Sequence, residues 1–211
     1  MCPSFMVTRD ERDSTRGRAN ALRLAMSGQL EGGLANDQLP EALDLCVSCK
    51  ACKAECPSSV DMARLKGEVM QYRYDRFGVS WRDRMIGRSP QVARVFAGWK
   101  ATGINAIQKF PGIRHGLMKM MGMDRRRHLP EYATRTWTQQ LQKNQKHTQK
   151  PDVILLVDTY TQCHHPDSGI AAVQLLERLG QKVMLLDAGC CQRPGISHGF
   201  LKEAAQKVKP G

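Results

Sequence analysis

The chain has 211 residues, which is enough for one or two small domains and too few for a large α/β enzyme. Its 32 basic and 20 acidic side chains give a formal net charge of +12, and its eight cysteines are too many to be incidental. No apolar run approaches the roughly 18 residues that cross a bilayer, and no secretory signal is evident, so we exclude an integral membrane protein and expect a cytoplasmic one.

The N-terminal part of the chain is predicted to be helical. Apolar residues recur at helical spacing within residues 13–26. A short helix is expected to open at Pro40. A longer helix is expected to begin at Ser58 or Ser59, where a hydroxyl can cap it, and to end near Gly78.

The middle of the chain, residues 71–150, holds all of the excess charge, with 17 basic and 4 acidic side chains. Glycine and proline break residues 81–123 into short helices, and residues 138–151 have the composition of a linker. Three interpretations of the charge stay open: a solvated connector, a docking surface for an acidic partner or the inner face of a membrane, and a nucleic-acid surface. The last is disfavoured because the stretch has no recognisable groove-reading motif. The methionine-rich stretch 118–123 fits a core stripe better than a membrane contact.

The C-terminal part of the chain has the pattern of a βαβ unit. Two apolar, β-rich runs predict parallel strands that are buried on both faces, with an amphipathic helix between them. The carboxyl ends of such strands meet at one edge of the sheet, where open α/β sheets place their ligands. The expected elements are a strand at 153–157, a helix at 170–179, a strand at 183–186 and a helix at 200–208.

Half of the cysteines form the run C-x2-C-x2-C-x3-C-P, namely Cys46, Cys49, Cys52 and Cys56. This spacing lets three successive thiolates reach three different irons of one [4Fe-4S] cluster, while the fourth ligand comes from elsewhere in the chain. In two-cluster ferredoxins the last cysteine of each run serves the other cluster. Cys2, which a proline follows, is therefore the expected fourth ligand, and Cys56 is left for a second cluster.

Zinc is the alternative metal for this run, because CxxC pairs also suit Zn²⁺. Zinc ribbons usually separate their two pairs by a dozen or more residues, which favours the iron–sulfur cluster here. A disulfide framework is disfavoured by the crowding of four cysteines and the missing signal.

A second cysteine group follows the predicted strands. Cys190 and Cys191 come after the second strand, and Cys163 lies on the loop that leaves the first. These three cysteines are candidate ligands of a further metal or redox site. Ordinary packing at the strand ends is the open alternative.

Taken together, these stretches resemble a known family, the FAD-linked D-2-hydroxyacid dehydrogenases and oxidases that carry a fused [4Fe-4S] ferredoxin module and a cysteine-rich domain. The iron–sulfur subunits of glycolate oxidase and of anaerobic glycerol-3-phosphate dehydrogenase are similar. The family's cysteine-rich domain has two Cys-Cys-Gly elements, whereas this chain has one, with Gln192 in place of glycine. The resemblance rests on residues 1–5, the Ser-Thr-Arg-Gly-Arg-Ala-Asn segment 14–20, the run 46–57, the segment 190–194 and residues 199–201.

The resemblance implies a multidomain α plus α/β fold. Residues 1–75 would form an α-helical 4Fe-4S ferredoxin-like domain, residues 76–150 a basic helical connector and linker, and residues 151–211 a truncated βαβα cysteine-rich domain. The chain looks like a fragment, and it is expected to be the electron-transfer part of an oxidoreductase rather than catalytic alone.

The implied function is electron transfer from reduced flavin through a [4Fe-4S] cluster to an acceptor. FAD would lie on a missing upstream domain or on a partner flavoprotein. The alternative function is a zinc-stabilised basic module that engages nucleic acid or an acidic surface. A third interpretation is a gene product that folds poorly, because Cys56 lacks its cluster and the sheet lacks strands.

Overall fold

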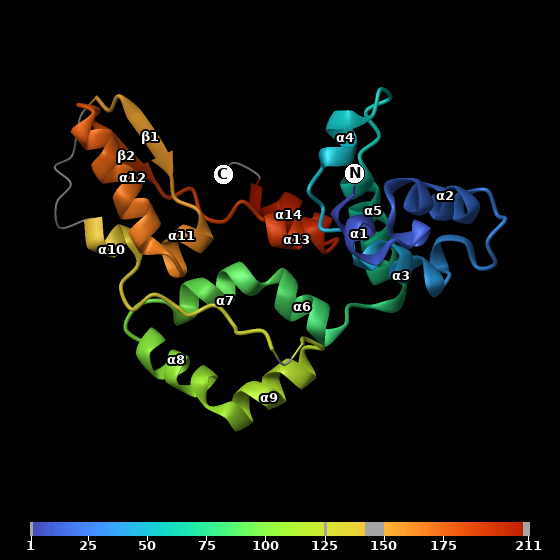
Figure 1. Ribbon diagram of the computed structural model, residues 1–211, viewed down its shortest axis with the longest axis horizontal. Helices are drawn as coiled ribbons and strands as arrows, with labels where there is room; N and C mark the ends of the chain where they lie inside the picture. The colour runs from blue at the N-terminus through green and yellow to red at the C-terminus, as the bar shows by residue number, and fades with distance from the viewer. Residues whose placement is uncertain (1, 125, 142–149, 209–211) are drawn as a thin grey trace. The chain divides into compact units, whose positions relative to one another are not determined.

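The computed structural model describes residues 2–124, 126–141 and 150–208. This part of the chain is mostly helical, with one small parallel sheet (Figure 1). It divides into two compact units, of which unit 1 comprises residues 1–87 and 192–211, and unit 2 comprises residues 88–191. No helix in the described ranges is long and apolar enough to span a membrane. The expected boundaries at residues 75 and 150 stay a prediction.

Unit 1 is made of helices from both ends of the chain. The sequence predicts the C-terminal helix to lie in the same domain as the strands. In the structure the C-terminal helices pack instead against helices of the N-terminal part. The elements are α1 (Pro3–Thr8), η1 (Glu11–Asp13), α2 (Thr15–Met26), η2 (Gly33–Ala35), α3 (Gln38–Asp44), α4 (Ala51–Glu55), α5 (Met62–Phe77), α6 (Trp81–Gly87), α13 (Arg193–Ser197) and α14 (Leu201–Val208).

Helix α2 begins where the sequence predicts, and a close approach to η1 shapes its first turn. The Ser14 hydroxyl caps the helix by accepting a hydrogen bond from the Gly17 N–H, at 2.8 Å. A Cβ added to Gly17 would run into the carbonyl oxygen of Glu11, so this position requires glycine. The chain can therefore pass tightly from η1 into α2.

Helix α5 begins later than the sequence predicts. Ser59 has a left-handed backbone, with φ 53°, and its N–H donates to the Cys56 carbonyl, so the chain makes a further turn before the helix. The cap is Asp61, whose carboxylate accepts from the Arg64 N–H at 3.0 Å. The expected cap at Ser58 or Ser59 is therefore wrong, and the helix ends at Gly78 as predicted.

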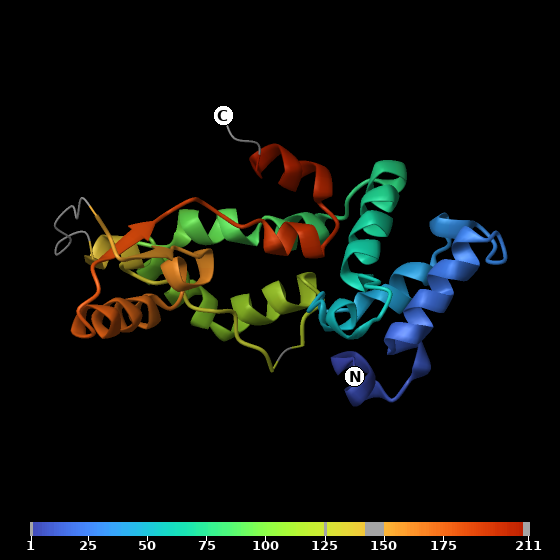
Figure 2. The same cartoon turned by 90° about the horizontal axis from the view of Figure 1, so that it is seen from above.

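The core of unit 1 joins α2, α3 and α5, and Figure 2 shows α5 beside α2. At the other end of α5, the Tyr74 ring stacks on the Phe200 ring with centroids 5.1 Å apart. Gly87 leaves room for that ring, since a Cβ there would run into it. The buried apolar residues of the core are Leu22, Ala25, Leu39, Leu43, Met62 and Val69.

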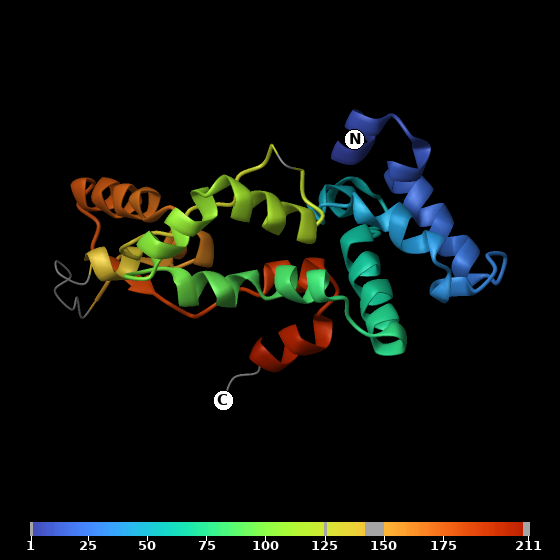
Figure 3. The ribbon, with the colours of Figure 1, turned by 90° about the horizontal axis from the view of Figure 1, so that it is seen from below.

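Unit 2 contains the sheet, as the sequence predicts. Strands β1 and β2 pair in parallel, with Val153 opposite Val183, and α12 packs beside them (Figure 3). The elements are α7 (Ser89–Phe96), α8 (Ala101–Lys109), α9 (Pro111–Met120), α10 (Trp137–Leu141), β1 (Val153–Leu156), α11 (Thr159–Cys163), α12 (Pro166–Arg178) and β2 (Val183–Leu186).

The sheet is covered on one face only, which corrects the expected burial on both. On the covered face, Trp137 and Val173 pack against Val183 of β2. The side chains of Ile154 and Leu156 alternate with the covered residues and are exposed. The other face of this two-stranded sheet is not covered by a layer of unit 2 in the part of the chain that the structure describes. The linker expected at 138–151 lies mostly outside the described residues.

The short helices expected in residues 81–123 are present as α6 to α9. The methionine-rich stretch does not act as one surface, because Met118 is fully buried while Met120 is exposed. Its first methionine therefore belongs to the core, as the core interpretation predicts.

The packing of α13 makes the stability of unit 1 depend on pH. Burial, and after it the positive charge of Lys66, lowers the pKa of His198, which caps the end of α13. Arg82 also lowers this pKa, while Asp83 and Asp44 oppose the shift. An imidazole whose pKa falls on folding takes up its proton more readily in the unfolded chain, so folding stability falls as the pH drops below the ordinary pKa of 6.5.

We expect His198→Gln to reduce the loss of stability between pH 7 and pH 5. The measurement is the urea midpoint of unfolding at each pH, followed by circular dichroism. His115→Gln, at an exposed position on α9, is the matched control for removal of an imidazole. An identical pH dependence in His198→Gln and the parent chain would contradict the assignment.

Candidate iron–sulfur site

The predicted cluster-binding run forms a tight loop between α3 and α4. Ser48 and Lys50 both have left-handed backbones, with φ of 52° and 64°, so the chain reverses twice within a few residues. Such alternation is typical of concavities in which backbone N–H groups face an anion. No described residue accepts a hydrogen bond from the N–H groups of residues 47–50, which leaves these donors available.

Four cysteines line one cavity of about 80 Å³ beside this loop. They are the three of the run that the sequence groups together and the one expected from the N-terminus: Cys46, Cys49, Cys52 and Cys2. Cys56, which caps the end of α4, is not among the lining residues. The structure thus brings together the four residues that the sequence assigns to one cluster and leaves the fifth outside.

Arg18 fastens Cys2 to the cavity. Its guanidinium is almost fully buried and donates hydrogen bonds to Cys2 Sγ at 3.1 Å, to Ser4 Oγ at 2.8 Å and to the Ala42 carbonyl at 2.9 Å. Burial alone would raise the pKa of the Cys2 thiol, but the hydrogen bonds with Ser4 and Arg18 outweigh it and lower the pKa to about 7. A thiolate is the form that binds metals, so these contacts prepare Cys2 as a ligand.

Two further cations reach the loop backbone. The buried Lys66 ammonium donates to the Cys46 carbonyl at 2.8 Å and lies 3.5 Å from the Asp44 carbonyl. Arg193, at the start of α13, donates to the Ser48 carbonyl at 2.8 Å. The loop is therefore held from α5 and α13, two helices that are distant in sequence.

Some buried polar groups beside the cavity have no hydrogen-bond partner. The Ser48 hydroxyl is buried and has no hydrogen-bond partner. Arg18 has Asp13 as its nearest carboxylate, at 4.0 Å, and in the described part of the chain Lys66 has no carboxylate within 4.0 Å. Buried charge is costly unless an opposite charge compensates it. A thiolate-bound [4Fe-4S] cluster is an anion with sulfide acceptors, so the residues present fit that group.

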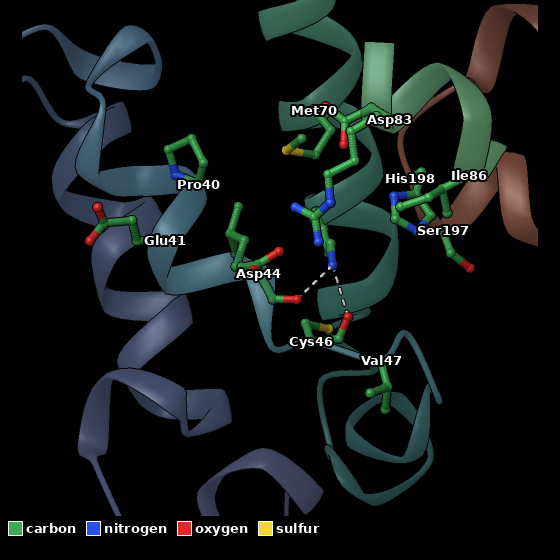
Figure 4. A pocket seen from close by; sticks show the side chains of 13 residues that line it. Pro40, Glu41, Asp44, Cys46, Val47, Met70, Asp83, Ile86, Ser197 and His198 are labelled. Carbon is green, nitrogen blue, oxygen red and sulfur yellow. Dashed lines mark hydrogen bonds between the residues drawn. The ribbon is translucent and has the colours of Figure 1, made fainter. Parts of the chain in front are cut away.

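A larger cavity of about 520 Å³ is also lined by residues of this loop (Figure 4). Cys46 and Val47 line both cavities, so they form the wall between them. Ser197 and His198 of α13 face the larger cavity beside Ile86 (Figure 4). This side of Cys46 is thus open to solvent.

The second cysteine group lies in unit 2 and is not brought together as a metal site. Cys163 is fully buried at the end of α11, and burial raises the pKa of its thiol, which favours the neutral form. At the carboxyl end of β2, Asp187 pairs with Arg94 at 2.9 Å. Among the described residues, no three His, Cys, Asp or Glu side chains form a group that could hold one metal ion. Metal binding by Cys163, Cys190 and Cys191 stays a prediction.

Three residues of the site escaped the sequence reasoning, namely Arg18, Lys66 and Arg193. Arg18 and Arg193 lie within the segments that carry the family resemblance, but nothing in a single sequence shows that an arginine is buried. Lys66 could have been suspected, because it lies within four residues of Met62 and Val69 on the apolar side of α5.

The comparisons with known proteins agree with this geometry. Residues 1–61 match the family model of the 4Fe-4S dicluster domain. D-2-hydroxyglutarate dehydrogenase from Escherichia coli (strain K12) is 22% identical, over 99% of this chain and 25% of that protein. The dehydrogenase of the same name from Pantoea ananatis (strain AJ13355) is 25% identical, over 98% of this chain and 24% of that protein.

The chain covers a larger share of a third relative. The glycolate oxidase iron–sulfur subunit from Escherichia coli (strain K12) is 24% identical, over 90% of this chain and 43% of the subunit. The chain thus spans less than half the length of these relatives, and no solved structure matches it significantly. Residues 1–61 are a 4Fe-4S dicluster domain, and the chain is distantly homologous to D-2-hydroxyglutarate dehydrogenases and to the glycolate oxidase iron–sulfur subunit.

Proposed function

We propose that this chain is the iron–sulfur electron-transfer module of an FAD-linked oxidoreductase of the D-2-hydroxyacid dehydrogenase type. The observation that carries the proposal is the cavity lined by Cys2, Cys46, Cys49 and Cys52 and surrounded by buried donors. When bound there, a [4Fe-4S] cluster supplies one-electron redox chemistry. Electrons would come from reduced flavin on a partner domain or subunit and leave to an acceptor.

The residues of this chain hold and tune the group rather than move protons. The four thiolates would ligate it, and the Ser48 hydroxyl and the N–H groups of residues 47–50 would donate to its sulfides. Val47 and Cys49 are exposed, so the edge of the loop is the point that a redox partner can approach. No side chain is needed as an acid or base.

The dicluster family name implies a second cluster, to which we assign Cys56. This cysteine ends the run but does not line the first cavity. The rule that the last cysteine of each run serves the other cluster predicts this division.

The ligand assignment predicts different results for different cysteines. Cys49→Ser and Cys2→Ser should each lose most of the bound iron and the EPR signal of the dithionite-reduced chain, because each removes one of four ligands. Cys56→Ser should keep both. The measurement is iron content and EPR after anaerobic purification.

Cys191→Ser is the matched control, since this exposed cysteine lies in unit 2. Retention of the full signal by Cys49→Ser, or an equal loss in Cys191→Ser, would contradict the assignment.

The charge of Arg18 predicts a shift in the reduction potential. A buried cation stabilises the more negative, reduced form, so Arg18→Gln should make the potential more negative by on the order of 60 mV, which is about 1.4 kcal/mol for one electron. Arg18→Lys, which keeps the charge, should shift it less. The measurement is a potentiometric titration followed by EPR.

Arg16→Gln provides the control for this shift, because Arg16 lies two residues away on the same helix with its side chain 85% exposed. Equal potentials for the Arg18→Gln and Arg16→Gln chains would contradict the tuning role. If Arg18→Gln binds too little iron to titrate, the reduction potentials of Arg18→Lys and Arg16→Gln are compared instead. Equal potentials for these two variants would then contradict the tuning role.

A further inference from the structure

Helix α8 of unit 2 carries apolar residues on both of its sides. On the inner side Ala101 is fully buried, and Asn105 exchanges two hydrogen bonds with the Tyr132 backbone, at 2.8 and 2.9 Å. On the outer side Ile107 and Phe110 are exposed, and Trp99, eight residues before Ile107, is 85% exposed. Surface helices normally expose a polar side. The exposed apolar residues of α8 therefore indicate a surface that something apolar covers.

Helix α9 continues this surface. Ile113 and Met120 are exposed seven residues apart, a spacing that places them on one side of the helix. Phe110 caps the end of α8 and the start of α9, so it joins the two stripes. The two helices follow one another with a bend between them (Figures 1 and 3). We call this set the α8–α9 ridge: Trp99, Ile107, Phe110, Ile113 and Met120.

The charged side chains of the segment that carries the ridge are all basic. Residues 88–123 contain six basic side chains and no acidic one. Lys100 lies against the Trp99 ring, with its ammonium 5.6 Å from the centroid. Lys119 is exposed on α9, whereas Lys109 is paired with Glu131 at 2.9 Å. Lys100 and Lys119 therefore border the ridge, and the segment 88–123 that contains them has no acidic residue.

We propose that the α8–α9 ridge docks onto an anionic lipid membrane. Trp and Phe next to Lys are typical of helices that lie in the interface of a bilayer, where the rings enter the headgroup region and the ammonium groups meet lipid phosphates. The proposal is independent of the cluster and of its redox function.

The test is co-sedimentation of the full chain with lipid vesicles. Phosphatidylcholine vesicles with about one third phosphatidylglycerol should bind the chain at least about tenfold more tightly than vesicles of phosphatidylcholine alone, and high salt should abolish the difference. The double variant Trp99→Ser/Phe110→Ser should lose at least about tenfold in binding. Lys100→Glu/Lys119→Glu should lose a similar factor, since each cation near an anionic surface contributes about fivefold.

The matched control is Leu175→Ser/Leu179→Ser, because both leucines are exposed apolar residues of unit 2 outside the ridge. This variant should bind as the parent chain does. Trp99→Phe should also bind, but it should lose the blue shift of tryptophan fluorescence that vesicles cause in the parent chain.

Three results would overturn the proposal. One is the absence of binding to the anionic vesicles. Another is an equal loss in the leucine control. The third is a ridge-dependent dimer, or ridge-dependent binding of single-stranded DNA, without vesicle binding, which would assign the surface to a second copy or to nucleic acid instead.

Discussion

The buried guanidinium of Arg18 is the contact on which the rest of unit 1 depends. It joins the N-terminal arm, through Cys2 and Ser4, to the end of α3, through the Ala42 carbonyl. Without it, the arm that carries Cys2 would have no buried attachment beside the cavity. The glycine before it in the chain lets α2 start close enough to η1 for this side chain to turn inward.

The same contact places buried positive charge beside the cavity. Arg18 and Lys66 bring two positive charges into the interior, where the buried Asp13 carboxylate lies 4.0 Å from the Arg18 guanidinium. A cluster ligated by four thiolates would add negative charge beside these cations. Binding of a cluster would therefore stabilise the fold of unit 1.

Much of this organisation could be predicted from the sequence. The cysteine spacing predicts the ligand set, because cluster geometry leaves few ways to wrap a chain around four irons. The structure places these four cysteines around one cavity. The strands were predicted to within a residue, because short β-rich apolar runs are strong signals. The start of α5 was misplaced, because the choice between Ser59 and Asp61 as a cap depends on a left-handed turn that no local pattern shows.

Other features depend on contacts between distant segments and were out of reach. The C-terminal helices α13 and α14 pack on α5 and α6, and within unit 2 the side chains of Ile154 and Leu156 on the sheet are exposed. Arg193 reaches the Ser48 carbonyl across 145 positions of sequence, and no periodicity predicts such a pair. The exposure of Ile107 on α8 and of Phe110 at its end also escaped the sequence reasoning, because amphipathic patterns do not say which side faces the core.

The central claim is that Cys2, Cys46, Cys49 and Cys52 hold a [4Fe-4S] cluster. Quantitation of iron, acid-labile sulfide and zinc in the anaerobically purified chain tests it most directly. The account predicts about four irons and four sulfides per chain, with zinc well below one. Stoichiometric zinc without sulfide would contradict the account and support the zinc-stabilised module instead.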